Sequence, residues 1–402
     1  MTQLGYKLVD FDTHYYETID AFTAYQDSAI SRAGRGVEMI MRDGRTYAAI
    51  GGRISKFVPN VTFNRVAPPG SLEAYFKGEA GGRRPSELVT SEEVRPEYQS
   101  LEARIATLAS QGVEEALLLP TFAYAIEEAL KDDIEAMHST IKAFNMWLQA
   151  TWSFTGPAVA APILPLADPV LAADELERLL DAGARVLTMG PGPVRGIGDV
   201  RHSPAHRLYD PVWRRIDEAG ITVAYHAADS GYFRYFKDYD DPAEFNAFST
   251  KVRLGSLWSI DRPMQDMLGA MIMQKFFYRY PNVRIVSVEQ GSDWLLVLMK
   301  KLDKAYRQRR ALFAENPAET IRRHVSVCPF WEDDIDKLLD AIGVDQVVFG
   351  SDWPHPEGVA EPADFVAYLG NLAQSDVQKV MRTNARELMR RRPASRSAYN
   401  AS

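Results

Sequence analysis

Two hydrophobic periodicities alternate along most of this chain. Short apolar runs, typical of buried strands, follow segments in which apolar residues recur every three or four positions, as on one face of a helix. The apolar runs predict strands at 8–14, 115–119, 158–164, 185–189, 221–226, 283–289, 325–328 and 345–352. The helical periodicity predicts helices at 97–111, 123–150, 169–182, 210–219, 261–280, 292–312 and 333–342. Eight β segments that alternate with helices indicate an α/β fold with a parallel sheet, most simply a closed (β/α)8 TIM barrel.

A doubly wound open sheet is the structural alternative. That fold places a glycine-rich phosphate-binding turn after its first strand, whereas this chain has Asp12, Thr13 and His14 there. We therefore expect a single barrel domain over residues 1–392, followed by a flexible tail at 393–402.

The regular alternation is interrupted by a long insertion at about residues 15–96. Within it, two strand-like segments at 37–42 and 45–50 flank Asp43-Gly44, a dipeptide typical of tight β-hairpin turns. Long insertions at the functional end of a barrel commonly form lids or subunit contacts. We expect a lid or a dimer arm here, and hence a homodimer is compatible with the sequence.

Composition narrows the class of partner. A net charge of -8 argues against nucleic acid, because phosphate binding needs clustered positive charge. The only cysteine, Cys328, excludes an intrachain disulfide and fits a reducing compartment. The N-terminus lacks an apolar signal segment, and no run of about 18 apolar residues occurs. We expect a cytoplasmic protein that acts on a small molecule and has no membrane partner.

The first predicted strand contains ligand-type side chains. In a regular strand alternate side chains share a face, so Asp10, Asp12 and His14 should point the same way. Two carboxylates and an imidazole are costly to bury unless a divalent cation compensates them. The alternative is a strand whose polar face simply meets water.

Other predicted strands also end in such groups. His226 closes the strand at 221–226, Glu289 closes the strand at 283–289, and Asp352 follows an apolar run and precedes His355. The C-terminal ends of barrel strands are where (β/α)8 enzymes place functional residues. These side chains therefore predict one site together with those of the first strand.

On these residues the chain resembles the amidohydrolase superfamily, specifically the branch that includes aminocarboxymuconate-semialdehyde and γ-resorcylate decarboxylases. The motifs that support the resemblance are Asp10-Phe11-Asp12-Thr13-His14, His226, Glu289-Gln290-Gly291-Ser292 and Gly350-Ser351-Asp352-Trp353-Pro354-His355. The resemblance covers nearly the whole barrel.

The resemblance implies a metal centre with the ligands Asp12, His14, His226 and Asp352. Histidine is commoner than aspartate at position 12 in the family, and the extra carboxylate favours a harder metal. Zinc, iron and manganese all remain open.

The resemblance also favours one metal ion per chain. The strand at 185–189 offers no lysine that could be carboxylated to bridge two ions, as in the usual two-metal version of the superfamily. Asp10 and Glu289 are the residues that could hold a second ion by another route.

Two chemistries follow from such a metal. One is hydrolysis of an ester, thioester, amide or lactone, in which a metal-activated water attacks a carbonyl and Asp352 takes its proton. The other is non-oxidative decarboxylation of an aromatic or unsaturated acid, in which a protonated acid, again Asp352, delivers a proton to carbon. Glu289 and His355 are further catalytic candidates. Hydrolysis is the first expectation, decarboxylation the second, and a non-catalytic barrel scaffold the third.

An arginine aimed at the metal would favour decarboxylation, because it would bind the carboxylate of the substrate. Arg195, Arg234 and Arg253 are candidates that sequence alone does not separate.

Overall fold

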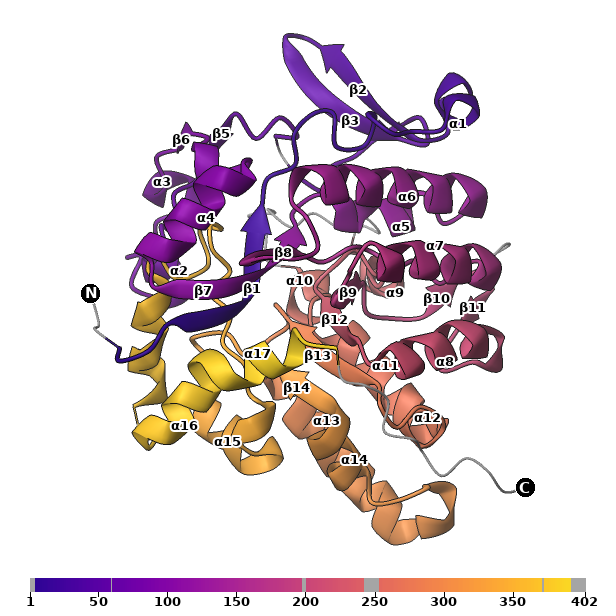
Figure 1. Ribbon diagram of the computed structural model, residues 1–402, viewed down its shortest axis with the longest axis vertical. Helices are drawn as coiled ribbons and strands as arrows, with labels where there is room; N and C mark the ends of the chain where they lie inside the picture. Colours follow the sequence, from indigo (N-terminus) through magenta and orange to yellow (C-terminus); the bar gives the residue numbers. More distant parts are fainter. Residues whose placement is uncertain (1–3, 59, 197–199, 242–252, 371, 392–402) are drawn as a thin grey trace.

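The computed structural model describes most of the chain (Figure 1). The described residues are 4–58, 60–196, 200–241, 253–370 and 372–391. The predicted tail at 393–402 lies outside them. Within the described residues, no helix is both long and apolar enough to cross a membrane.

The fold is mixed α/β and is built around two parallel sheets. The larger sheet has the strand order β14-β13-β12-β9, and the smaller has the order β1-β7-β8. Their bounds are β14 (Val325–Val327), β13 (Arg284–Val288), β12 (Thr222–His226), β9 (Val186–Met189), β1 (Leu8–Tyr15), β7 (Val113–Pro120) and β8 (Ala158–Ala160). All of these strands fall on the predicted apolar runs.

Isolated parallel bridges connect these sheets with each other and with the eighth predicted segment. Ile163 pairs with Thr188, which joins the end of the β8 segment to β9. The remaining bridges pair Val327 with Val347 and Thr13 with Trp353. The C-terminal ends of the strands in both sheets are therefore brought to the same side of the molecule.

The eighth segment is not the continuous strand that the sequence predicts at 345–352. Its backbone bonds go in several directions: Val348 N–H donates to Val327 O, Phe349 N–H donates to Val380 O, and Phe349 O accepts from Phe11 N–H. Because neighbouring residues bond to different parts of the chain, no regular ladder forms.

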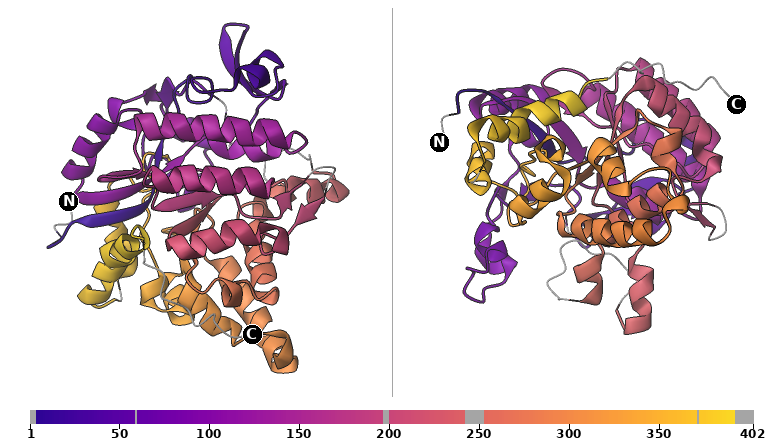
Figure 2. Two further views of the ribbon diagram at one scale, coloured as in Figure 1. Left: turned by 45° about the vertical axis from the view of Figure 1, so that its right-hand side comes forward. Right: turned by 90° about the horizontal axis from the view of Figure 1, so that it is seen from below.

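Helices cover the outer face of the sheets. The longer ones are α4 (Leu101–Ser110), α6 (Ile134–Thr151), α7 (Pro169–Asp181), α8 (Asp210–Ala219), α11 (Arg262–Met273), α13 (Asp293–Gln308), α14 (Pro317–His324) and α15 (Ile335–Ile342). Shorter ones are α1 (Ser28–Arg32), α2 (Glu73–Phe76), α3 (Pro85–Leu88), α5 (Ile126–Ala129), α9 (Phe233–Phe236), α10 (Leu254–Trp258), α12 (Phe276–Arg279), α16 (Gln374–Gln378) and α17 (Asn384–Leu388). In both Figure 1 and Figure 2, α6, α7 and α8 lie side by side.

Two predicted helices are broken in the structure. The helix expected at 123–150 is divided into α5 and α6, and Asp133 begins the second by accepting a hydrogen bond from Ala136 N–H. The helix expected at 261–280 is divided into α11 and α12 at Lys275, whose φ of 56° is left-handed. A local capping interaction and a left-handed residue each end a helix that periodicity alone would continue.

The first insertion contains small antiparallel sheets, seen at the top of Figure 1. Strands β2 (Val37–Arg42) and β3 (Arg45–Ile50) pair with Arg42 opposite Arg45, so Asp43 and Gly44 form the turn. The insertion also contains the short strands β4 (Arg53–Ile54), β5 (Arg65–Val66) and β6 (Glu92–Glu93). Two further short strands, β10 (Val194–Arg195) and β11 (Arg201–His202), follow β9.

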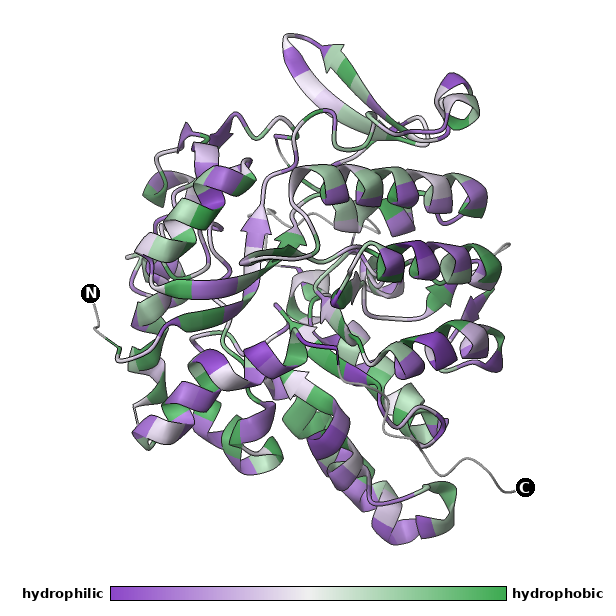
Figure 3. Ribbon diagram, viewed as in Figure 1, coloured by the Kyte–Doolittle hydropathy of each residue, from purple (hydrophilic) through white to green (hydrophobic). Residues whose placement is uncertain are grey.

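A separate apolar cluster combines residues from both parallel sheets. Val9 and Phe11 of β1 pack in it with residues such as Leu117, Val286 and Val348. Figure 3 shows that β1 is apolar where it begins and polar toward its end. Along β1, the residues of this apolar cluster therefore precede the polar residues at the end of the strand.

Candidate metal centre

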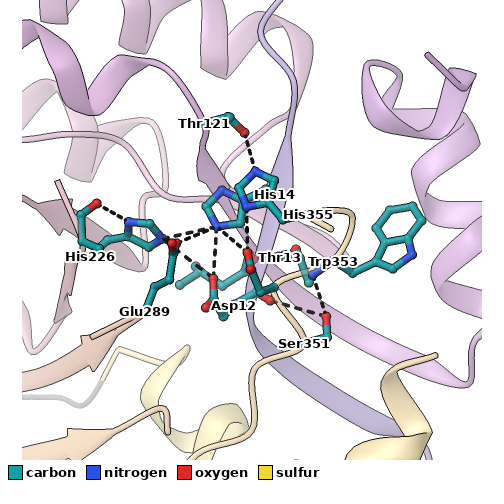
Figure 4. A network of polar contacts seen from close by, with 12 residues as sticks. Asp12, Thr13, His14, Thr121, His226, Glu289, Ser351, Trp353 and His355 are labelled. Atoms are coloured by element: carbon teal, nitrogen blue, oxygen red, sulfur yellow. Dashed lines mark hydrogen bonds and ion pairs between the residues drawn. The ribbon is translucent and has the colours of Figure 1, made fainter. Parts of the chain in front are cut away.

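The residues predicted for the site converge at the C-terminal ends of the parallel strands (Figure 4). They are Asp12 and His14 in β1, His226 at the end of β12, Glu289 directly after β13, and Asp352 and His355 after the eighth segment. Sequence positions more than 300 residues apart thus form one cluster, which we call the metal cluster.

His14 lies at the middle of the metal cluster. Its Nε2 atom is 3.3 Å from Asp12 Oδ1, 3.4 Å from Asp352 Oδ1 and 3.6 Å from Glu289 Oε2. His226 Nε2 is 3.2 Å from His14 Nε2 and 2.7 Å from Glu289 Oε2. Two imidazole nitrogens and three carboxylates therefore face one small volume.

Backbone carbonyls orient both imidazoles. His14 Nδ1 lies 3.2 Å from Pro120 O, and His226 Nδ1 lies 2.7 Å from Ala227 O. A carbonyl oxygen only accepts hydrogen bonds, so each Nδ1 carries the hydrogen and each Nε2 of a neutral ring presents a lone pair. Two lone pairs 3.2 Å apart repel each other unless a cation lies between them.

The donor set fits a divalent transition-metal ion. Two overlapping groups have ligand atoms within 4.8 Å of one another, namely Asp12, His14 and His226, and His14, Glu289, Asp352 and His355. Asp12 Oδ1 is buried and accepts no hydrogen bond within the described part of the chain. A mixture of imidazole and carboxylate ligands suits zinc, manganese or iron.

The carboxyl groups of the cluster respond differently to their surroundings. Burial, reinforced by the neighbouring Glu289, raises the pKa of Asp352 well above its usual value. Burial also raises the pKa of Asp12, although His226 opposes it. Burial acts in the same direction on Glu289, but the adjacent His226 outweighs it and lowers the pKa of Glu289. A bound cation would lower the pKa of all three carboxyls, and at Asp352 burial opposes that effect.

Two of the carboxylates stand on strained backbone. Glu289 and Asp352 both have φ of 56°, in the left-handed region that residues with a side chain seldom adopt. In both cases the residue directly follows a strand or strand-like segment, so the left-handed turn directs the side chain into the cluster.

The predicted alternation of β1 is wrong in one respect, because the strand contains an irregularity. Asp10 lies opposite Ala116 and Thr13 opposite Leu118, so three steps along β1 match two along β7. Phe11 and Asp12 both lie within this irregular stretch. Phe11 packs in the separate apolar cluster, as Val9 does before it, and Asp12 Cβ lies against position 350.

Asp10 consequently does not share the face of Asp12 and His14. Its Oδ1 atom accepts hydrogen bonds from Ser351 N–H at 3.0 Å and Asp12 N–H at 3.2 Å. Asp10 lies outside both ligand groups found among the described residues. Its visible function is to tie β1 to the segment that carries Asp352.

Gly350 leaves the space that Asp12 occupies. A Cβ atom at position 350 would lie 2.4 Å from Asp12 Cβ and 2.4 Å from Cys328 Sγ. We expect Gly350→Ala to destabilise the fold by about 1–3 kcal/mol through overpacking and to weaken metal binding by displacing Asp12. Denaturant unfolding and metal titration would measure both effects. Gly5→Ala, at a position with nothing within 4 Å, is the matched control and should change neither.

The loop after β7 contacts the outer sides of two site histidines. Thr121 Oγ1 lies 3.1 Å from His355 Nε2, while His355 Nδ1 lies 2.8 Å from Asp352 Oδ1. The Tyr124 ring stacks on His226 at 4.5 Å with an interplanar angle of 4°. The loop therefore fixes the orientation of both imidazoles.

Sequence reasoning missed two residues that position this site. Glu17 Oε1 accepts hydrogen bonds from Phe122 N–H at 2.7 Å and Ala123 N–H at 3.0 Å, which anchors the loop after β7. Arg104 is fully buried and donates to His14 O. Glu17 could have been noticed as an acidic residue three positions after His14. Arg104 lies in a helical pattern that does not distinguish it from a surface arginine.

The candidate arginines make contacts away from the metal cluster. Arg195 forms an ion pair with Glu128. Arg234 donates to Gly231 O and Tyr235 Oη. Arg253 precedes α10, where its backbone N–H donates to a serine hydroxyl. None of these contacts joins an arginine to the metal cluster.

Comparisons with known proteins agree with this geometry. A family model described as Amidohydrolase matches residues 9–391. The 2-amino-3-carboxymuconate-6-semialdehyde decarboxylase of Dictyostelium discoideum is 22% identical over 256 residues, which cover 56% of this chain and 68% of that protein.

Solved structures share the fold. A crystal structure of an amidohydrolase from Mycobacterium avium subsp. paratuberculosis K-10 is 40% identical, with a TM-score of 0.92 and coverage of 98% of this chain and 100% of that chain. A dihydroxybenzoic acid decarboxylase from Polaromonas sp. JS666, solved with manganese and the inhibitor 2-nitroresorcinol, is 16% identical with a TM-score of 0.60. That alignment covers 96% of this chain and 97% of the decarboxylase, and at this identity it shows the fold alone.

Proposed function

Because this chain belongs to the amidohydrolase family, we propose that it is a metal-dependent enzyme that decarboxylates an aromatic or unsaturated carboxylic acid without oxidation. The observation that supports this most directly is the position of Asp352. Its Oδ1 lies 3.4 Å from His14 Nε2 and 2.8 Å from His355 Nδ1, so one carboxyl borders both the ligand atoms and a second titratable group. The curated relative named as a decarboxylase supports the same reaction.

We infer further that the parallel strands close into a (β/α)8 barrel. The isolated bridges support closure, because Ile163 connects the β8 segment directly to β9, while Val347 and Trp353 connect β14 and β1 through the eighth segment.

The proposed ligands are Asp12, His14, His226 and Asp352, with manganese as the first metal to test because the Polaromonas enzyme was solved with it. When bound there, a divalent ion supplies a positive charge that holds a substrate oxygen and stabilises negative charge developed in the reaction. Glu289 Oε2, which lies 2.7 Å from His226 Nε2, would border the same ion.

In this proposal the chain itself supplies the proton. Asp352 in its protonated form delivers a proton to the substrate carbon that bears the carboxylate. The bond between that carbon and the carboxylate then breaks, its electron pair restores the carbon–carbon double bond that protonation consumed, and carbon dioxide leaves. His355, hydrogen-bonded to Asp352 and in contact with Thr121, is placed to return a proton to the carboxylate.

Hydrolysis is the second candidate, and the arginine contacts favour it. An arginine aimed at the metal would favour decarboxylation, whereas the guanidinium groups of Arg195 and Arg234 bond elsewhere. In a hydrolase the unprotonated Asp352 would accept the proton of an attacking water instead.

Isotope incorporation distinguishes the two reactions. The purified protein, loaded with manganese, zinc or iron, would be incubated in heavy water with dihydroxybenzoates and with a matched set of aryl esters and lactones. We expect carbon dioxide release from an acid, with one deuterium at the carbon that lost the carboxylate, and loss of activity when the metal is chelated. Turnover of esters or lactones alone would move the assignment to hydrolysis.

A further inference from the structure

A pocket adjoins Tyr124, whose ring also contacts His226 of the metal cluster. One face of the Tyr124 ring stacks on His226 at 4.5 Å, and the same side chain lines the pocket. The apolar part of the lining consists of Leu164, Leu166, Met189, Pro191, Pro204 and Ala228. The pocket is thus one aromatic ring away from the candidate metal centre.

The polar side of this pocket has an excess of carboxylates. Glu128 is neutralised, because it pairs with both Arg195 and Lys131. Glu127 and Asp229 line the pocket, and no ion pair to either occurs within the described part of the chain. Among the described lining residues, two carboxylates therefore accompany a single cation, Arg195, which already pairs with Glu128.

The pKa values of Glu127 and Asp229 are both raised in this pocket. Burial raises the pKa of Glu127 to about 7, against the opposing effect of Arg195. Burial, and then the nearby Glu128, raise the pKa of Asp229. A positive group in the pocket would relieve this unfavourable burial.

The pocket also contains a hydroxyl group without a partner. Tyr225 is 1% exposed and lines the pocket, and its hydroxyl forms no hydrogen bond within the described part of the chain. A buried hydroxyl left in this way is costly, so it marks a place where a ligand atom would gain a hydrogen bond.

The arrangement suits an organic cation better than a metal ion. Among the described residues, only groups in the metal cluster have ligand atoms close enough to share one ion, and neither Glu127 nor Asp229 belongs to them. The apolar walls and the Tyr124 ring instead favour a ligand with a hydrocarbon or aromatic body.

We propose that this pocket binds a small molecule that combines an apolar or aromatic body with an ammonium group, which meets Glu127, Asp229 and the Tyr225 hydroxyl. The proposal rests on the proposed function only in taking this ligand to be part of the substrate, remote from the reacting carboxylate. It predicts that substrates with an amino group are preferred over those with a second anionic group.

Calorimetric titration of the manganese-loaded protein with benzylamine and with benzyl alcohol would test the pocket without turnover. The two probes share a ring and differ in charge at neutral pH. We expect benzylamine to bind at least tenfold more tightly. The double variant Glu127→Gln/Asp229→Asn should abolish the difference, and Tyr225→Phe should weaken benzylamine binding severalfold. The exposed Asp132→Asn is the matched control and should leave both affinities unchanged.

Equal affinities for the two probes, or no binding of either to the folded, metal-loaded protein, would overturn the proposal. So would a preference for benzylamine that survives in both the double variant and Tyr225→Phe. Decarboxylation is assayed separately, so a protein that shows the binding preference but no decarboxylation refutes only the proposed function. Decarboxylation without the preference refutes only the pocket assignment.

Discussion

Asp352→Asn is expected to lower kcat by about 10³-fold, the range typical of removing a general acid or base. Asparagine has nearly the same shape and keeps an oxygen that can face the metal, so the fold and most of the metal content should persist. It has no carboxyl proton to deliver to carbon and cannot take one from water. The loss is therefore expected for decarboxylation and for hydrolysis alike. Turnover assays, metal analysis and circular dichroism of the same sample would check it.

A control on the same stretch of chain separates chemistry from charge. Asp345 is exposed and pairs with Lys379 at 3.0 Å, well outside the cluster. Asp345→Asn removes the same charge and should leave kcat unchanged. Full activity in Asp352→Asn would remove Asp352 from the mechanism.

His226→Ala is expected to cause the second large effect, which is loss of the metal together with loss of stability. His226 Nε2 faces His14 Nε2, and alanine removes one of the two imidazole nitrogens of the proposed ligand set. A metal that binds only the folded state stabilises it by about 2.7 kcal/mol when its concentration is 100 times Kd. That increment should disappear in the variant.

Melting curves with and without chelator measure this increment directly. The wild-type Tm should fall when the metal is removed, whereas the Tm of His226→Ala should not respond to chelator. His206→Ala, an exposed histidine that caps a short helical turn, should behave as wild type. A His226→Ala protein that still shows a chelator-dependent Tm would show that His226 is not a ligand.

Periodicity predicted the regular part of this fold well because the signals there are local. The helix predicted at 210–219 coincides with α8, and the strand predicted at 221–226 overlaps β12 at Thr222–His226. The candidate ligand side chains were recognisable because they interrupt apolar runs at strand ends. His226 and Glu289 needed no knowledge of tertiary structure to be noticed.

The remaining features depend on contacts between distant segments, which a local pattern does not record. The bulge in β1 appears only from its register with β7, and it redirects Asp12 relative to Asp10. The pocket behind Tyr124 combines Glu127 with Asp229, about a hundred positions apart in the chain, and neither residue interrupts a regular pattern. Their closeness follows from packing rather than from spacing.

The left-handed backbone at Glu289 and Asp352 means that a substitution which relieves strain there also removes a carboxylate from the metal cluster. A non-glycine residue held in this region costs about 1–3 kcal/mol, and glycine would remove most of that cost while deleting a carboxylate from the cluster. In the metal-free protein, selection for thermal robustness alone would therefore favour glycine at both positions and remove both carboxylates from the cluster. An engineering campaign that screens for melting temperature in the absence of metal should hold these two positions fixed.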